Sequence, residues 1–463
     1  MHAKTNTRLV FWSITAALAG FLFGFDTVVI SGAEQQIQDL WQLSSLVHGL
    51  CLSSALWGTV LGAFLGGVPT EKYGRRRTLI AIGALYFVSA IGSALAQDQF
   101  VFMISRFIGG LGVGIATVAA PLYISEISPA NLRGRLAGMF QFNIVFGILI
   151  AFVSNYFLGK YLVSDIAWRW MLGIEAIPAA IYSILCLRIS ESPRWLIVHG
   201  QRAAGMKVFR QINPDMSEHD LNELADSVSD SSGEEKSAPR FFTSRLKVPI
   251  LLAFFIAFFN QLSGVNAILY FAPRIFEWTG LGSQAALLQS VGIGVTNLVF
   301  TFLGLYLIDR LGRRTLLYIG SYGYIVTLGL CAWAFATENF AIVPICIFAF
   351  IGAHAIGQGA VIWVFISEIF PNKHRAAGQA LGSFTHWFFA ASLTLVFPMA
   401  VGGLAATFPA PEGSATGINS VVPTIIFGFF CIMMVLQLIW VKVMVPETKG
   451  VALEDMQSAF RRK

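Results

Sequence analysis

The chain has 463 residues, of which 56% are hydrophobic and 12% charged, whereas a soluble globular domain has roughly 25% charged residues. Together with 40 Phe and 11 Trp, this composition excludes a soluble protein and predicts that lipid is the solvent for most of the chain. The net charge of +6 comes from short basic clusters between long apolar runs, which excludes a nucleic-acid-binding domain.

Twelve apolar stretches are each long enough to span a bilayer, which takes about twenty helical residues. The first stretch carries Asp26 and lacks a small-residue cleavage site, so we interpret it as a spanning helix and not as a signal peptide. The sequence therefore predicts an all-α protein with twelve transmembrane helices in an inner or plasma membrane. In chain order, the stretches are residues 9–30, 47–69, 78–96, 100–124, 136–158, 168–188, 248–273, 284–308, 315–336, 341–366, 377–402 and 420–444.

The basic residues predict the orientation of these helices. If the N-terminus is cytoplasmic, the external loops contain only Lys160, Arg169 and Arg274, and the other loops carry the basic clusters. This bias is the one that places basic loops in the cytoplasm. Because the number of spans is even, both termini are predicted to be cytoplasmic.

Residues 189–247 form the one long polar insertion, which this orientation also places in the cytoplasm. Ser217 and Asp220 resemble a capping box, which predicts a short helix that runs through Leu224. The Ser-rich and acidic residues 227–238 are typical of a flexible linker.

Two motifs occur twice in the chain. The sequence EKYGRRR at residues 71–77 recurs as DRLGRR at 309–314, and SEISP with a following Arg133 recurs as SEIFP with Arg375. The second pair keeps one offset of 242 residues, from 125 to 367 and from 133 to 375. This duplication predicts two six-helix halves, and two such halves around a central cavity are the architecture of a rocking transporter. The predicted units are residues 1–188, 189–247, 248–445 and a cytoplasmic tail of 446–463.

Seven motifs in order resemble those of the sugar porters of the major facilitator superfamily, over nearly the whole chain. The resemblance implies the major facilitator fold and import of a hexose or pentose by proton symport, most like that of bacterial xylose/proton symporters. The motifs are Gly24–Asp26 with Ile30–Gly32, both Gly-Arg-Arg loops, Arg106–Gly110, Pro121–Glu126, Glu191–Leu196, Gln261–Asn266 and Pro446–Gly450.

A sugar is a ring of hydroxyl groups, so its site needs uncharged amides in mid-membrane and aromatic faces against the C–H surfaces. A single membrane amide can equally serve as a hydrogen bond between helices, but a cluster in one helix facing amides of two others favours a binding site. The resemblance implies sugar contacts at Gln141, Asn260, Gln261, Asn266, Asn297, Trp363, His386 and Trp387.

The chain departs from the family pattern at several of these positions. Asn260 stands where Gln is common, and His386 stands where Asn or Gln is usual, so His386 can be a sugar contact, a pH-sensitive group or a structural donor. Gln358 and Ala360 replace prolines of the tenth helix. A helix without those prolines keeps more backbone hydrogen bonds and is predicted to kink less.

Asp26, Arg106 and Glu175 lie within predicted spans, where ionisable residues usually serve function. The resemblance implies that they couple sugar transport to a proton, because proton symporters have an acid at the Asp26 position and facilitative animal carriers have an amide. The alternative is a static ion pair between Asp26 and Arg106.

Charged residues also recur at the cytoplasmic helix ends of both halves. They are either plain positive-inside charges or ion pairs that hold the cytoplasmic side closed, and their matched positions favour this cytoplasmic gate. They are Glu71, Arg75, Arg76, Glu126, Arg133, Asp309, Arg313, Arg314, Glu368 and Arg375.

Two further functions compete with the symporter. One is a facilitator that carries sugar downhill, and the other is a membrane sugar sensor; sensor relatives add a long tail, whereas this chain ends about thirteen residues after its Pro-Glu-Thr-Lys-Gly motif. No nucleophile–base pair, metal cluster or nucleotide loop predicts an enzyme, and the GGLGVG run at 109–114 lies in a span, where it favours close helix packing.

We expect no cofactor and no metal, a proton as the coupling ion, and a sugar and the lipid bilayer as partners of a functional monomer. The cysteines lie in apolar stretches without metal-ligand spacing, which predicts buried thiols at Cys51, Cys186, Cys331, Cys346 and Cys431.

Overall fold

The computed structural model describes residues 6–129, 132–214, 216–233, 241–412, 414 and 416–450, and these residues form helices and no strand. Twelve helical stretches are long and apolar enough to cross a membrane. The predicted number of spans and the all-α fold class are therefore confirmed.

The first six spans and the polar insertion comprise twelve α-helices and one 3₁₀ turn. They are α1 Thr7–Val29, η1 Ile30–Gly32, α2 Glu34–Leu40, α3 Ser45–Leu65, α4 Gly67–Tyr73, α5 Arg75–Leu95, α6 Gln99–Ile127, α7 Arg133–Tyr161, α8 Ser164–Gly173, α9 Ala176–Cys186, α10 Pro193–Val198, α11 Arg202–Ile212 and α12 Glu218–Gly233.

The last six spans contain more interruptions. Their elements are η3 Ser244–Leu246, α13 Lys247–Leu262, α14 Val265–Tyr270, α15 Ala272–Glu277, α16 Ser283–Leu311, α17 Arg313–Ala336, η4 Phe340–Ile342, α18 Val343–His354, the π-helical turn η5 Ala355–Gly359, α19 Ala360–Ile369, η6 Asn372–His374, α20 Arg375–Thr407 and α21 Val421–Met444.

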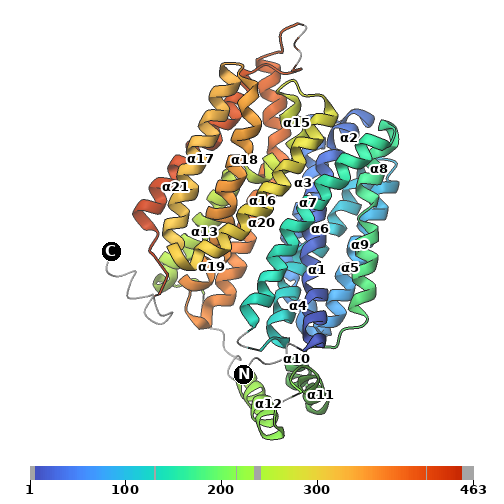
Figure 1. Ribbon diagram of the computed structural model, residues 1–463, viewed down its shortest axis with the longest axis vertical. Coiled ribbons are helices and arrows are strands. Elements are labelled where there is room, and N and C mark those ends of the chain that lie inside the picture. The colour runs from blue at the N-terminus through green and yellow to red at the C-terminus, as the bar shows by residue number, and fades with distance from the viewer. Residues whose placement is uncertain are drawn as a thin grey trace.

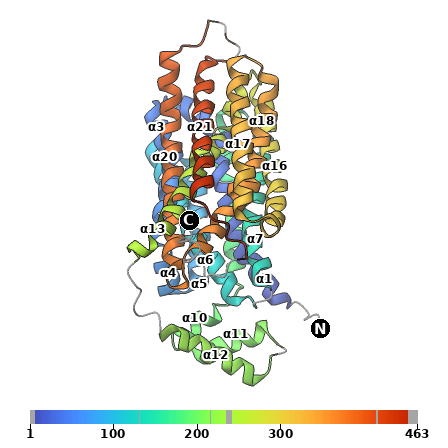
Figure 2. The ribbon, with the colours of Figure 1, turned by 90° about the vertical axis from the view of Figure 1, so that its left-hand side faces the viewer.

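The helices form two bundles that stand side by side, the N-terminal half in blue to green and the C-terminal half in yellow to red (Figure 1). The helices α10, α11 and α12 lie together beyond one end of the bundles, as Figure 2 shows. We call this the insertion end, and we call the opposite end, where α2 and α15 lie, the far end.

Two helix pairs make the main contacts between the halves, α3 with α20 and α7 with α16. Aromatic rings cross both boundaries, with 5.7 Å between the ring centres of Trp57 and Phe388 and 5.6 Å between those of Phe142 and Phe302. Tilted and edge-on ring pairs at this spacing are favourable contacts. The halves are therefore joined along two seams.

Small residues allow close packing within the N-terminal half. A side chain at Gly110 of α6 would overlap the carbonyl oxygen of Ala55 on α3. A side chain at Gly114 of α6 would likewise overlap backbone atoms of α3. Glycines at such spacing let two membrane helices approach closely. The GGLGVG run thus serves packing, as the sequence predicted.

Three predicted spans are not single helices. The span at 168–188 divides into α8 and α9, and the span at 248–273 divides into α13, α14 and α15. The tenth span lacks its usual prolines, yet it contains the π-helical turn η5. The smaller kink predicted for this helix remains a prediction, and π-helical turns occur often at functional sites.

The insertion begins its last helix as predicted but ends it later. The side chain of Ser217 accepts the backbone N–H of Asp220 at 3.1 Å, as in a helix cap. The helix α12 then continues to Gly233 and not only to Leu224. The predicted linker is therefore wrong up to Gly233, and residues 234–238 lie outside the described part of the chain.

Apolar packing explains the longer helix. Leu221, Ala225 and Val228 repeat at helical spacing along α12 and are buried against Ile197 of α10 and Phe209 of α11. A helix of this length is stabilised mainly by such an apolar face and not by its own propensity. The Ser-rich composition of residues 227–233 did not reveal this face.

The five cysteines are free thiols. Four are buried as predicted, and Cys431 is half-buried. Their surroundings are apolar helix contacts, so they act as small hydrophobic side chains.

Candidate functional site

The seventh span is interrupted at the centre of the molecule. Gly264 has a backbone φ of +85°, and a side chain at this residue would come within 2.6 Å of the ring of Phe430. Only glycine adopts this conformation without strain and fits this space. The break between α13 and α14 therefore depends on Gly264, and the polar residues on either side of it lie within the membrane-spanning region.

Gln261 is the centre of a hydrogen-bonded group at this break. Its side-chain N–H donates to Asn260 at 2.8 Å, and its side-chain oxygen accepts from Asn266 at 2.7 Å. The same Gln261 nitrogen lies 3.1 and 3.2 Å from the two ring nitrogens of His386 on α20. The three amides are at most 8% exposed, so the structure brings these four predicted residues together.

Aromatic rings lie beside this group. The ring centre of His386 is 5.2 Å from that of Trp363 on α19 and 4.9 Å from that of Trp387. Phe23 of α1 contacts Trp387 across the two halves, with ring centres 5.4 Å apart. Amides next to aromatic faces are the usual lining of a site for a neutral polar ligand.

Gln141 and Asn297 are half-buried on α7 and α16, the helix pair of one seam. Thr301 donates to the side-chain oxygen of Asn297 at 3.4 Å. Within the described part of the chain, neither amide is hydrogen bonded to the Gln261 group. Their predicted contact with a sugar remains a prediction.

Gln358 lies in the π-helical turn and is fully buried. Among the described residues, neither polar atom of its amide has a hydrogen-bond partner. A buried amide without a partner costs about 1–3 kcal/mol, so this position calls for a water molecule or a ligand hydroxyl. The sequence showed only that a proline was missing there.

The three predicted coupling residues lie together in the N-terminal half. The guanidinium of Arg106 forms an ion pair with the carboxylate of Asp26 and also donates to the Asp26 carbonyl oxygen at 3.0 Å. Glu175, at the turn between α8 and α9, lies close enough to interact with both. All three are at most 2% exposed.

Two carboxylates thus face one guanidinium in a buried region. If all three were ionised, one negative charge would be uncompensated, which is costly in a low dielectric. A proton on one carboxyl group removes this cost, so the triad can bind and release a proton.

Tyr270 connects this triad to the helix break. It is one helical turn beyond Asn266 on α14, is 1% exposed, and lies within electrostatic range of Asp26 and Arg106. It therefore belongs to both groups, across the two halves. Tyr270 was not among the predicted site residues, although its i, i+4 spacing from Asn266 places both residues on one helix face.

The predicted gate residues form two equivalent networks at the insertion end. In the N-terminal half, Arg75 binds Glu126 through two nitrogens, at 2.9 and 2.8 Å, and binds Glu71 at 2.8 Å. Bidentate pairing of this kind fixes geometry as well as charge. The guanidinium of Arg75 thereby ties α4 and α6 to the start of α5.

The C-terminal half repeats the arrangement. Arg313 binds Glu368 at 3.0 and 2.7 Å and Asp309 at 3.2 Å. Each of these ion pairs lies within one half. The side chain of Arg133 lies outside the described residues and Arg375 is half-buried, so a latch between the halves remains a prediction.

Two acids that the sequence analysis quoted only as motif members complete these networks. Glu191 accepts the backbone N–H groups of Arg75 and Arg76 at 2.8 and 3.1 Å. Glu447 does the same for Arg313 and Arg314, at 2.9 and 3.0 Å. Each acid therefore caps the first turn of a spanning helix.

We expect Glu447→Ala to lower stability by about 1–2 kcal/mol, because it removes the acceptor of two helix N–H groups. The midpoint of thermal unfolding in detergent measures this loss. Glu223→Ala is the matched control, since Glu223 is exposed on α12. A midpoint no lower than that of this control would contradict the capping role.

The far end is closed by contacts that cross the halves. Arg274 of α15 donates to both carboxylate oxygens of Glu34 on α2 at 2.8 Å and to Gln38 at 2.6 Å. Beside them, Gln35 donates to Glu277 at 2.8 Å. Arg274 was predicted only as an external basic residue. Nothing in the local sequence marks Glu34, which lies 240 positions earlier, as its partner.

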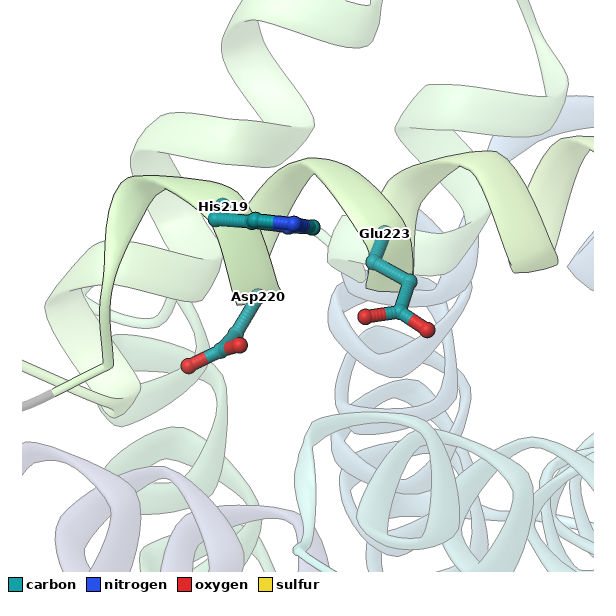
Figure 3. A group of neighbouring side chains, drawn as sticks. All are labelled: His219, Asp220 and Glu223. Atoms are coloured by element: carbon teal, nitrogen blue, oxygen red, sulfur yellow. The ribbon is translucent and has the colours of Figure 1, made fainter.

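One group of possible metal ligands occurs in the described part of the chain, His219, Asp220 and Glu223 on α12 (Figure 3). All three side chains are exposed. Acids in the first helical turn are favoured by the helix dipole alone. The group therefore supports no metal site.

Comparison with known proteins decides the family. The family model described as "Sugar (and other) transporter" matches residues 12–460. The chain belongs to this sugar transporter family. It is a multi-pass membrane protein, and the predicted resemblance is confirmed.

The relatives of this sugar transporter agree with the match. The D-xylose-proton symporter of Escherichia coli (strain K12) is 32% identical, over 99% of this chain and 97% of the symporter. The arabinose-proton symporter of Bacillus subtilis (strain 168) is 31% identical, over 97% and 94%. The inward-open conformation of the xylose transporter XylE from E. coli has a TM-score of 0.82 at 29% identity, over 97% of this chain and 99% of that one.

Proposed function

We propose that this transporter imports a monosaccharide together with a proton across the plasma or inner membrane. The observation that carries the proposal is the buried triad of Asp26, Arg106 and Glu175, which Tyr270 connects to the amide group of the seventh span. The names of the two proton symporters support it, since this chain aligns with both over almost its full length.

The amide group is the proposed sugar site. Gln261, Asn266 and Asn260 offer donors and acceptors to hydroxyl groups, and His386 extends this row from α20. Trp363 and Trp387 supply aromatic faces, and Gln141 and Asn297 are proposed to complete the site across the α7–α16 seam. A sugar hydroxyl would replace the hydrogen bonds that these side chains now make to one another.

The triad is the proposed coupling group. A proton on Asp26 weakens its attraction to Arg106, and Glu175 is the second buried carboxyl group that the arginine can then pair with. Tyr270 lies beside the ion pair and one turn from the sugar site, so a change in the ion pair reaches the helix that holds the sugar. The proton is the only coupling ion that this scheme needs, and it uses no cofactor.

The contacts that close the far end indicate which side of the transporter is closed in this conformation. We assign the far end to the external side and the insertion end, with both termini and α10–α12, to the cytoplasm, because basic residues gather at the insertion end. The cross-half contact of Arg274 and Glu34 then closes the external side. In a functional monomer, the two halves that rock are residues 1–188 and 248–445. The linker 189–247 joins them, and the tail 446–463 follows the second half.

The gate networks of Arg75 and Arg313 are the proposed cytoplasmic latch. Both are intact while the external side is closed, so in this conformation they hold the helix ends of each half together. We propose that their outer carboxylates, Glu71 and Asp309, exchange partners across the halves when the cytoplasmic side closes. Both acids are largely exposed, at 59% and 81%, so water can replace their present arginine partners.

The test is uptake of a panel of labelled pentoses and hexoses into proteoliposomes, with and without an imposed proton gradient. The proposal expects at least one sugar to accumulate above its outside concentration, and only when the gradient is present. Equal final concentrations inside and outside under both conditions would favour the alternative, a facilitative uniporter. Sugar binding without any uptake would favour a sensor.

A further inference from the structure

A buried histidine lies behind the ion pair that closes the external side. His48 of α3 is fully buried, and its ring nitrogen Nε2 lies 3.1 Å from one carboxylate oxygen of Glu34. The same oxygen accepts from Arg274 at 2.8 Å. One carboxylate oxygen is therefore shared between a titratable group of its own half and the arginine of the other half.

Few other charges face this histidine. Glu34 approaches it from α2 and Arg274 from α15, and the helix α3 itself carries no acid, lysine or arginine. From the C-terminal half, the ring of Phe271 lies edge-on at 6.3 Å, and the α20 side of the pocket is apolar. Asp39 and Glu277 also act electrostatically on Arg274. The charge of His48 is thus balanced against one carboxylate and one guanidinium.

A small cavity of about 70 Å³ lies at the same place, between the halves. His48, Arg274, Gln38 and Ser45 supply its polar lining, and the space is sufficient for water molecules. Among the described residues, neither ring nitrogen of His48 makes a hydrogen bond, although Nε2 lies 3.1 Å from the Glu34 carboxylate. A proton can therefore reach the ring through water in this cavity.

The carboxylate itself remains charged. Burial alone would raise the pKa of Glu34, but Arg274 and His48 hold it below its ordinary value. The pKa of Arg274 is correspondingly raised by Glu34, against the effect of its own burial. A buried carboxylate that stays ionised requires a cation beside it.

We propose that His48 makes the closure of the external side sensitive to pH. When His48 is protonated, it replaces Arg274 as the cation that balances the Glu34 carboxylate. With His48 neutral, Arg274 is the cation that balances Glu34, and the halves are held together. With His48 protonated, two cations share one carboxylate, and the repulsion between them is relieved when Arg274 leaves with its own half.

The sign of the effect follows from linkage. Opening removes Arg274 from the neighbourhood of His48 and exposes the ring to water, and both changes favour the protonated form. The closed state therefore holds a charged His48 beside Arg274, and the outward-open state separates the two cations. As pH falls, the population shifts toward the outward-open state. A low external pH would thus favour the conformation in which the sugar site is open to the external side.

This inference rests on the alternating access proposed above, but it is independent of coupling through Asp26. The experiment measures distances between nitroxide labels at the external ends of the two halves, at Leu46 of α3 and Ala285 of α16, which are both exposed. All variants carry Asp26→Asn, which removes the coupling acid, and Cys431→Ala, which removes the half-buried thiol. No sugar is needed.

We expect the ratio of long to short distances to rise about tenfold between about pH 8 and about pH 5.5, the range in which a histidine side chain changes its charge. His48→Asn should reduce this change to less than about twofold, and His48→Gln should do the same. Glu34→Gln should raise the fraction of long distances at every pH, because Arg274 then loses its partner. His219→Asn, at an exposed histidine of α12, is the control and should keep the full change.

A pH shift that persists in both His48 variants would overturn the proposal, as would the absence of any shift in the His219→Asn control. Neither result depends on sugar import, because the labels report only the two conformations. A failure of sugar accumulation in the uptake panel would in turn leave the distance measurement valid.

Discussion

Asp26→Asn is expected to abolish accumulation of sugar while sugar binding remains. Asparagine is close in size to aspartate but cannot change its charge, so Arg106 loses its ionic partner and the proton loses its acceptor. Moving one charge across a potential of about 150 mV supplies about 3.5 kcal/mol, which corresponds to a several-hundred-fold sugar gradient at about 1.4 kcal/mol per tenfold. The Asp26→Asn variant should lose the whole several-hundred-fold accumulation of sugar.

Two measurements in proteoliposomes check this result, the final ratio of inside to outside sugar and the rate of sugar exchange at equal concentrations. Exchange should continue in Asp26→Asn, because the amide group of the seventh span is unchanged. The variant Asp98→Asn is a matched control, since Asp98 only caps the start of α6 and should keep accumulation. If Asp26→Asn still concentrates sugar at parental levels, Asp26 is not the coupling acid, and Glu175 is the next residue to test.

Gln261→Ala is expected to weaken sugar binding more than any other single amide change. Its side chain contacts Asn260, Asn266 and His386, so alanine removes one sugar partner and leaves the others misaligned. Loss of a buried hydrogen bond costs about 1–3 kcal/mol, which raises the dissociation constant of the sugar about 5- to 150-fold. A binding titration with the sugar that is taken up fastest in the uptake panel measures this dissociation constant.

The matched control is Gln437→Ala. Gln437 is also a fully buried amide, and it donates to Ser321 at 2.9 Å between α21 and α17, with no hydrogen bond to the Gln261 group among the described residues. Its removal should lower stability but leave sugar affinity within about twofold of the parent. The site would be misplaced if Gln261→Ala and Asn266→Ala both bind sugar as the parent does.

The sequence predicted the spans and the duplicated motifs because both leave local signals. Twenty apolar residues have one stable conformation in lipid, and motifs such as those around Arg75 and Arg313 recur in matching positions. The structure shows the reason for the recurrence, since each arginine binds an acid in the equivalent place of its own half. The amides of the seventh span were predicted from the family resemblance, supported by their closeness along the chain.

Contacts between distant segments were not predictable. Glu34 and Arg274 meet because two halves lie side by side, and neither residue stands in an unusual local pattern. The breaks in the helices were hidden for another reason. The mean hydropathy of each span stays high although amides flank Gly264 and Gln358 lies in the π-helical turn η5. Hydropathy reports the environment of a segment and not the backbone geometry within it.

The central claim is that a proton accompanies each sugar, and charge movement tests it most directly. A monosaccharide of this kind is neutral, so addition of sugar to proteoliposomes at equal pH on both sides moves charge only if an ion travels with it. We predict an inward positive current on sugar addition, which rises with proton concentration and is absent in Asp26→Asn. Uptake of labelled sugar by the parent protein without any current would contradict the claim.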